Sequence, residues 1–197
     1  MSEIEQDIYV FVKQKIRALS QAQESVVKSS LAQLRRGVGK HPGSLPGLWG
    51  ITLDGLPNAL LSTDWQGVPT YGEWSVHTAI TLFALHQQGH DYKTKFMSRD
   101  GEKFGMAIRK LAPSDDDLPR IKRRFDAVIT ADSIEEVSQH LRGLVQLLKS
   151  KSIPLDYPEL AQDLYWFQIQ KARDNVRLKW GQDFYCTYKK EESENGK

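Results

Sequence analysis

Clusters of arginine are the groups in this sequence best suited to chemistry, and that chemistry is recognition of phosphate. The planar guanidinium can donate two parallel hydrogen bonds to one phosphate group. In the segment RIKRRF, Arg120 and Arg124 stand at the i, i+4 spacing of neighbours on a helix face. Like charges at this spacing repel each other on an isolated helix. The pattern therefore suggests that a polyanion binds there.

Other basic residues flank predicted apolar helix faces, and Lys40 follows in a glycine-rich loop whose backbone can approach a ligand closely. The full set of candidate nucleic-acid-binding residues is Arg35, Arg36, Lys40, Arg123, Arg124, Arg142, Arg173, Arg177 and Lys179. The alternative is that these residues belong to solvent-exposed helix faces that keep the protein soluble. Their charge would then be neutralised by acidic neighbours such as Asp126 and Asp174. Spacing alone favours neither interpretation.

The distribution of charge supports a basic surface in the second half of the chain. The formal net charge is only +2. Residues 1–92 hold 7 basic and 8 acidic side chains, whereas residues 93–190 hold 19 basic and 14 acidic ones. A local basic surface can attract phosphate backbones even on a nearly neutral protein.

Patterns typical of enzymes are weak in this sequence. Ser25 and Lys28 match S-x-x-K, the serine-nucleophile motif of penicillin-recognising enzymes, but its companion motifs are missing. The run Asp115–Asp117 could hold Mg²⁺ in a nuclease. Adjacent carboxylates in a short loop bounded by prolines more often cap the following helix, so a metal-dependent nuclease is a minor alternative.

Metal and cofactor sites are not expected either. His77 and His86 lie too far apart on one helix to share a metal, and Gly89 separates His86 from His90. The histidines are interpreted as core or surface residues, since a zinc site needs further ligands. The single Cys186 excludes a disulfide framework and a cysteine-rich zinc site, and no glycine-rich phosphate loop is present. We expect no catalytic residue, no metal and no cofactor.

The elements that must position the arginines are predicted to be helices. The chain has 197 residues, of which 40% are hydrophobic and 26% charged, as in ordinary globular proteins. Apolar residues recur at helical spacing and no strand alternation is present. The predicted helical segments are residues 4–19, 27–36, 73–88, 102–111, 121–129, 134–148 and 158–180. Segment 73–88 is apolar on nearly every side, which predicts a buried central helix. Ser133 and Glu136 match the S-x-x-E capping box at the start of segment 134–148. The apolar residues of the loop after the second segment, among them Leu48 and Trp49, are expected to pack onto the bundle.

These segments predict an all-α, two-lobed helical bundle of about seven to nine helices. The lobes are expected at residues 1–112 and 113–188, divided near the Pro- and Asp-rich segment 112–119, and the acidic tail 189–197 is expected to be disordered. No apolar run reaches the roughly 18–20 residues needed to cross a bilayer. The acidic start is unlike a secretory signal, so a cytoplasmic protein without membrane contact is expected.

The aromatic residues near the C-terminus offer surfaces on which nucleobases could stack. They are Tyr157, Tyr165, Trp166, Phe167, Trp180, Phe184 and Tyr185. A set of this kind more often forms part of a hydrophobic core.

Seven segments occur in an order that is similar to a known family. They are AQLRRG (32–37), GKHPGSLPGLWG (39–50), TLFALHQQ (81–88), RRFDAVITA (123–131), HLRGLVQLL (140–148), IPLDYPELAQDL (153–164) and VRLKWGQDFY (176–185). The set resembles the small subunit of the type I-E CRISPR surveillance complex Cascade, the CasB family, from about residue 30 to residue 186. The acidic tail from Glu191 has no counterpart in the family pattern.

The resemblance implies an all-helical protein without catalytic activity, present as two copies along a crRNA-guided complex. It implies contacts with the backbone subunits, the large subunit and a second copy, and a basic surface that holds target DNA and the displaced strand. Matched by position, the implied DNA-binding residues are Arg35, Arg36, Arg123, Arg124 and Arg142, with a looser match at Arg173, Arg177 and Lys179. A purely structural adaptor, whose basic face meets acidic partner proteins, stays open as the alternative.

Overall fold

The computed structural model describes residues 2–63 and 66–185. The α-helices of these two ranges are α1 (Glu3–Gln21), α2 (Glu24–Arg36), α3 (Trp49–Thr52), α4 (Tyr71–Gln87), α5 (Phe104–Arg109), α6 (Leu118–Thr130), α7 (Ile134–Lys151), α8 (Tyr157–Phe167) and α9 (Gln170–Tyr185). Short 3₁₀ turns at Pro42–Ser44, Pro46–Leu48 and Asn58–Leu60 lie between α2 and α4. Apart from one isolated bridge between Ser98 and Leu155, the described ranges contain no β-structure. The prediction of an all-α fold is confirmed.

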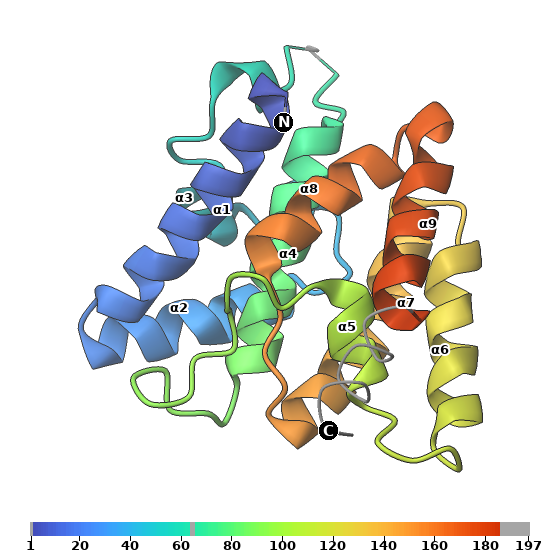
Figure 1. The fold of residues 1–197 in the computed structure, drawn as a ribbon. Coiled ribbons are helices and arrows are strands. Elements are labelled where there is room, and N and C mark those ends of the chain that lie inside the picture. Colours follow the sequence, from blue (N-terminus) through green and yellow to red (C-terminus); the bar gives the residue numbers. More distant parts are fainter. Residues whose placement is uncertain (1, 64–65, 186–197) are drawn as a thin grey trace.

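Helix α4 lies at the centre of the molecule (Figure 1), as its uniformly apolar sequence predicts. A capping box begins it: the Thr70 hydroxyl accepts from the Glu73 N–H at 3.0 Å, and the Glu73 carboxylate accepts from the Thr70 N–H at 2.8 Å. The box satisfies two N–H groups that the helix leaves without partners. Helices α1, α2, α7 and α8 pack around α4, so it is buried on nearly every face.

Two histidines of α4 are core residues, as the sequence analysis expects. His77 Nε2 lies 3.1 Å from the carbonyl oxygen of Gly37, and His86 Nδ1 lies 2.9 Å from the Tyr157 hydroxyl. Burial lowers the pKa of His77 and lowers the pKa of His86 to about 3, because a buried imidazolium loses its hydration. Both side chains are therefore neutral at pH 7.

Helices α5 and α9 approach each other very closely at Gly105. A Cβ atom at this position would meet the carbonyl oxygen of Trp180 and lie 2.7 Å from the backbone nitrogen of Phe184. Backbone atoms inside a helix cannot move aside as a side chain does, so the contact requires glycine. The Phe184 ring also stacks on Phe125 of α6 at a centroid distance of 4.4 Å. These contacts join α5, α6 and α9.

The prediction of one long helix over residues 158–180 is wrong. Helix α8 ends at Phe167, and the N–H groups of Gln168 and Ile169 bond to carbonyls three residues back, at 3.3 and 3.0 Å. Figure 1 shows that α8 and α9 then run in different directions. Helix α8 packs against α1 and α4, whereas α9 packs mainly against α5. The segment therefore forms two helices because its two halves pack against different partners. No proline or glycine lies at the point where the first helix ends.

Two local predictions are corrected in part. Ser133 caps α7 as expected by accepting from the Glu136 N–H at 3.2 Å, but the Glu136 carboxylate accepts from the N–H of Asp132, at 3.0 Å, and not from Ser133. In the loop after α2, Leu48 is buried as expected, whereas Trp49 is 41% exposed. Its indole N–H donates to the Pro42 carbonyl at 3.1 Å.

Helices on both sides of the predicted lobe boundary share one hydrophobic core. Residue 112 lies between α5 and α6, yet α7 and α8, which follow the boundary, pack against α4. The division into lobes 1–112 and 113–188 stays a prediction. The tail 189–197 and Cys186 lie outside the described residues.

Candidate nucleic-acid interface

Three arginines of α6 line a groove between α6 and α7, which we call the arginine groove. The apolar face of α6 is buried through Ile121, Phe125 and Val128, so its cations are left on the remaining faces. The groove has a volume of about 470 Å³ and is lined by Arg120, Arg123, Arg124, Ala127, Gln139, His140 and Gly143. The fold thus brings the predicted residues Arg123 and Arg124 together on one surface.

Helix α7 gives the groove its other wall. At Gly143 a Cβ atom would lie 3.6 Å from Nη1 of Arg124, an ordinary van der Waals distance. The Arg124 guanidinium therefore lies against the backbone of α7. Arg142, the preceding residue, is exposed on α7 outside the groove lining.

Few carboxylates neutralise the arginine groove. Arg120 Nη2 lies 3.3 Å from Asp117, and His140 Nε2 lies 3.7 Å from Glu136. Within the described residues, no carboxylate oxygen lies within 4.0 Å of the charged nitrogens of Arg123, Arg124 or Arg142. Their positive charge is consequently available to a ligand.

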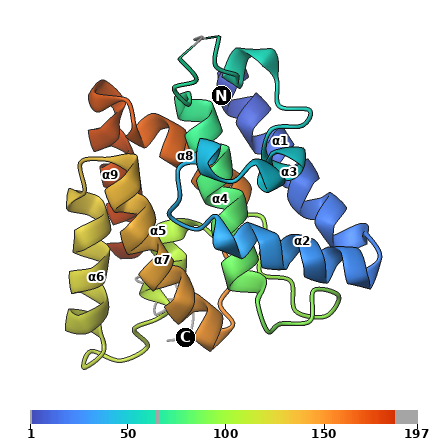
Figure 2. The ribbon, with the colours of Figure 1, turned by 180° about the vertical axis from the view of Figure 1, so that it is seen from behind.

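The cations at the end of α2 are also open to solvent. Arg36 and Lys40 are exposed and Arg35 is half-buried, all close to the C-terminal end of the helix. In the part of the chain that the structure covers, none of the three has an ion-pair partner. Figure 2 shows α2 and α7 on the side of the molecule turned toward the viewer, with α6 beside α7.

The predicted cations of α9 differ, because they bind groups within the protein. Arg177 donates to the carbonyl of Ala131 at 2.9 Å and contacts the carboxylates of Asp132 and Asp174 at 3.3 and 3.1 Å. Arg173 donates to the Phe167 carbonyl at 2.9 Å and lies 3.5 Å from Asp132. These two side chains are only 18% and 25% exposed, Arg173 being the lower.

Lys179 belongs to a partly buried charged cluster with Asp163 and Glu159. Its ammonium lies 2.7 Å from Asp163 and 2.9 Å from Glu159, and Asp163 also accepts from the Trp180 indole N–H at 2.7 Å. Burial raises the pKa of Asp163 to about 6, although Lys179 opposes that rise. Burial alone would lower the pKa of Lys179, but the two carboxylates raise it above its ordinary value. This lysine is engaged in holding α9 to α8.

The residues considered for enzymatic chemistry have other surroundings. Asp117 stands at the N-cap of α6, but its side chain accepts from Ser114 and Arg120 rather than capping the helix, so the capping interpretation is corrected. Lys28 of the S-x-x-K match lies 2.5 Å from Glu24. Over residues 2–63 and 66–185, no three His, Cys, Asp or Glu side chains are grouped as metal ligands, and no helix is long and apolar enough to cross a membrane.

Most of the C-terminal aromatic residues are core residues. Tyr157, Phe167, Trp180 and Phe184 are fully buried, which confirms the more common interpretation of such a set. Tyr165 and Trp166 are half-buried, and Tyr185 is 50% exposed.

The candidate set omits three polar or charged residues that line the arginine groove, which are Arg120, Gln139 and His140. Arg120 had a signal in the sequence, its i, i+4 spacing from Arg124. Gln139 and His140 had none, because only the packing of α6 on α7 brings them to the groove.

The chain is similar to proteins of one family along most of its length. Residues 30–185 match the family described as CRISPR-associated protein Cse2. The crystal structure of CasB from Thermobifida fusca is 34% identical, with a TM-score of 0.74 over 91% of this chain and 98% of that chain. The crystal structure of M. ruber CasB is 24% identical, with a TM-score of 0.61 over 98% of each chain, a likeness of fold alone. No curated protein matches the chain.

Proposed function

The chain belongs to the CasB/Cse2 family of the type I-E CRISPR complex Cascade, and we propose that it holds target DNA and the displaced strand there through its arginine groove. The family consists of structural Cascade subunits and is not known as a family of enzymes. In guide-directed recognition, base pairing reads the sequence while protein groups contact the strand backbones. A non-catalytic subunit with exposed arginines suits the second task.

The observation that carries the proposal is that Arg123 and Arg124 of the groove have no carboxylate partner among residues 2–63 and 66–185, with Arg142 exposed nearby. A guanidinium without a carboxylate partner can form bidentate hydrogen bonds with a phosphate at no cost in broken ion pairs. Arg36 at the end of α2 and Lys40 in the loop after it are two further exposed cations, which we assign to the proposed DNA-binding surface.

We assign contacts with neighbouring subunits to other faces of the molecule. Large apolar side chains remain exposed at Val68, Tyr71 and Leu178, which are 56%, 50% and 61% exposed and lie outside the groove lining. Exposed apolar side chains suit protein interfaces better than phosphate contacts. The proposed partners are the backbone subunits, the large subunit and a second copy of this chain.

The test is retention of target DNA by the assembled complex across a salt series. The Arg123→Glu/Arg124→Glu variant should assemble normally but release DNA at lower salt than the wild type. For the neutral variant Arg124→Gln, the slope of log K against log salt should fall by about 0.7–0.9, the value for one lost phosphate contact. Lys122→Gln is the matched control, because Lys122 lies on the same helix but bonds to Asp126 at 2.5 Å.

Three results would contradict the proposal. Unchanged retention in the double variant, with normal assembly, would remove Arg123 and Arg124 from the DNA-binding surface. Loss of assembly instead of DNA would show that the arginines meet acidic partner proteins, which is the adaptor function. Mg²⁺-dependent cleavage that is lost in Asp115→Ala or Asp116→Ala would reveal a nuclease.

A further inference from the structure

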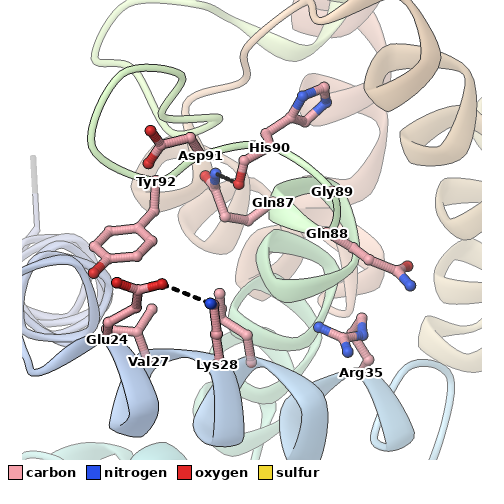
Figure 3. A pocket seen from close by; sticks show the side chains of 11 residues that line it. Glu24, Val27, Lys28, Arg35, Gln87, Gln88, Gly89, His90, Asp91 and Tyr92 are labelled. Carbon is pink, nitrogen blue, oxygen red and sulfur yellow. Dashed lines mark hydrogen bonds and ion pairs between the residues drawn. The ribbon is translucent and has the colours of Figure 1, made fainter.

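A second hollow, which we call the α2 pocket, lies between α2 and the loop that follows α4. Its volume is about 460 Å³. Val27 and Leu31 of α2 form an apolar floor. Figure 3 shows Arg35 and Gln88 at one end of the pocket and Tyr92 at the other, next to Glu24.

The loop wall of the α2 pocket is held in place by a buried amide. Helix α4 ends at Gln87, and Gly89, with a φ of +82°, turns the chain in a conformation that favours glycine. The Gln87 side chain donates to the carbonyls of His90 and Lys95 at 3.2 and 3.0 Å and accepts from the Met97 N–H at 2.9 Å. The wall is therefore preorganised, which lowers the entropy cost of binding.

Helix α7 connects the pocket with the positive surface. His90 Nε2 lies 3.0 Å from the carbonyl oxygen of Lys149, and the Lys149 ammonium donates to Gln88 at 3.1 Å. Arg142 and Lys149 are seven residues apart, which places them on one flank of α7 about 10 Å apart along its axis. A strand that follows this flank from the arginine groove reaches the end of the pocket at Arg35 and Gln88.

Most charged groups of the α2 pocket are already satisfied by protein partners. Lys28 pairs with Glu24 at 2.5 Å, and Asp91 accepts from the Lys93 N–H at 2.9 Å and the Thr94 hydroxyl at 3.1 Å. Among residues 2–63 and 66–185, no carboxylate lies within 4.0 Å of the Arg35 guanidinium. As far as the structure describes the chain, the pocket offers a ligand the unpaired cation of Arg35, an apolar floor and the half-buried Tyr92.

We propose that the α2 pocket receives one unpaired nucleotide of a single strand, with its phosphate on Arg35 and its base between the apolar floor and Tyr92. An anionic group at one end of a flat, mostly apolar body matches this division of the pocket. The inference rests on the proposed function for the path of the strand, but the pocket's affinity for a nucleotide does not depend on the arginine groove.

The test uses the full chain and a mononucleotide, 5-iodo-2′-deoxyuridine monophosphate, which forms adducts with nearby aromatic rings under ultraviolet light. Peptide mapping should place the adduct on Tyr92, and unlabelled thymidine monophosphate should compete. Arg35→Gln should lower the adduct yield about tenfold, the effect of one lost charged hydrogen bond. Yield with the phosphate-free nucleoside should stay unchanged in this variant. Arg17→Gln is the matched control, since Arg17 is an exposed arginine of α1 that lines neither the α2 pocket nor the arginine groove.

The outcomes separate this proposal from the function of the arginine groove. Absence of a Tyr92 adduct, or an equal yield from Arg35→Gln and wild type, would overturn the nucleotide pocket even if DNA retention depends on Arg123 and Arg124. An adduct that persists in Arg123→Glu/Arg124→Glu would support the pocket whatever the groove does. Defective assembly of Arg35→Gln with wild-type adduct yield would assign the pocket to a partner protein instead.

Discussion

Arg124 of α6 and Arg177 of α9 belong to arginine pairs of the same spacing but have opposite surroundings. Arg120 and Arg124 on α6, like Arg173 and Arg177 on α9, stand four residues apart. On α6, Arg124 lies in an open groove, and no carboxylate of the described residues lies within 4.0 Å of its guanidinium nitrogens. On α9, Arg177 bonds to a backbone carbonyl and to two aspartates.

The difference shows that the position of the acidic partners, not the arrangement of the basic residues, decides what a cluster does. An arginine that already bonds to carboxylates must give up those bonds before it can bind phosphate, and a partly buried ion pair is costly to break. Arg173, Arg177 and Lys179 of α9 therefore act in stability, whereas Arg123 and Arg124 of α6 remain available to a ligand. Three experiments test this contrast.

The largest effect is expected from removing the ammonium of the α8–α9 cluster. Lys179→Met should lower the free energy of unfolding by about 3 kcal/mol, because Asp163 and Glu159 then lose their shared cation. Denaturant unfolding measures the change. The matched variant Arg123→Met should leave the denaturation midpoint unchanged.

A second substitution sharpens this prediction. The variant Asp163→Asn/Lys179→Met removes both the carboxylate and the ammonium. The amide oxygen introduced at position 163 can still accept a hydrogen bond from the Trp180 indole N–H. We expect the double variant to recover most of the lost stability, since replacing both members of a buried pair is often nearly neutral. Strict additivity of the two single effects would show that the two residues do not form a stabilising pair.

The next largest effect is a change in the free energy of unfolding with pH. The folded protein binds a proton at Asp163 up to about pH 6, whereas the unfolded chain releases it near 3.8. This group's contribution to stability is therefore fully present below about pH 4 and is lost as pH rises through 6. Relative to Asp163→Asn, the wild type should lose about 2 kcal/mol between pH 4 and pH 7. Lys179, Trp180 and Glu159 face this carboxyl group.

Unfolding curves of both proteins over that range give the difference, in which the titration of other groups cancels. Arg123→Gln, altered in the open groove, should follow the wild-type pH profile. A constant difference between the wild type and Asp163→Asn would contradict the raised pKa.

The smallest expected effect distinguishes Arg177, which bonds to groups within the protein, from Arg142, which is exposed. Arg177→Ala should destabilise the protein by about 1–2 kcal/mol, because it removes the bonds to Ala131, Asp132 and Asp174. Arg142→Ala should leave thermal unfolding unchanged and weaken DNA retention instead. The contrast fails if both variants unfold alike or if Arg177→Ala alone affects DNA.

Periodicity in the sequence predicts the helices well because backbone geometry sets it locally. The spacing of Ile8, Val12 and Ile16 places them on one face of α1, and the uniformly apolar α4 is central as expected. The positions of charged residues in the sequence predict the binding surface less well than periodicity predicts the helices. The sequence includes Arg123, Arg124 and Arg177 in one candidate set, with a looser family match at Arg177, and the structure separates them by their surroundings.

The residues of this chain thus determine its helices, its buried faces and its family by themselves. The tertiary structure alone decides that residues 158–180 form two helices and that Asp132 reaches Arg177 across the chain. It alone forms the arginine groove and the α2 pocket, whose walls come from separate segments. The physical reason is range: a helix forms from bonds between residues four apart, whereas neutralisation of a charge depends on whichever carboxylates the packed core brings within a few ångströms.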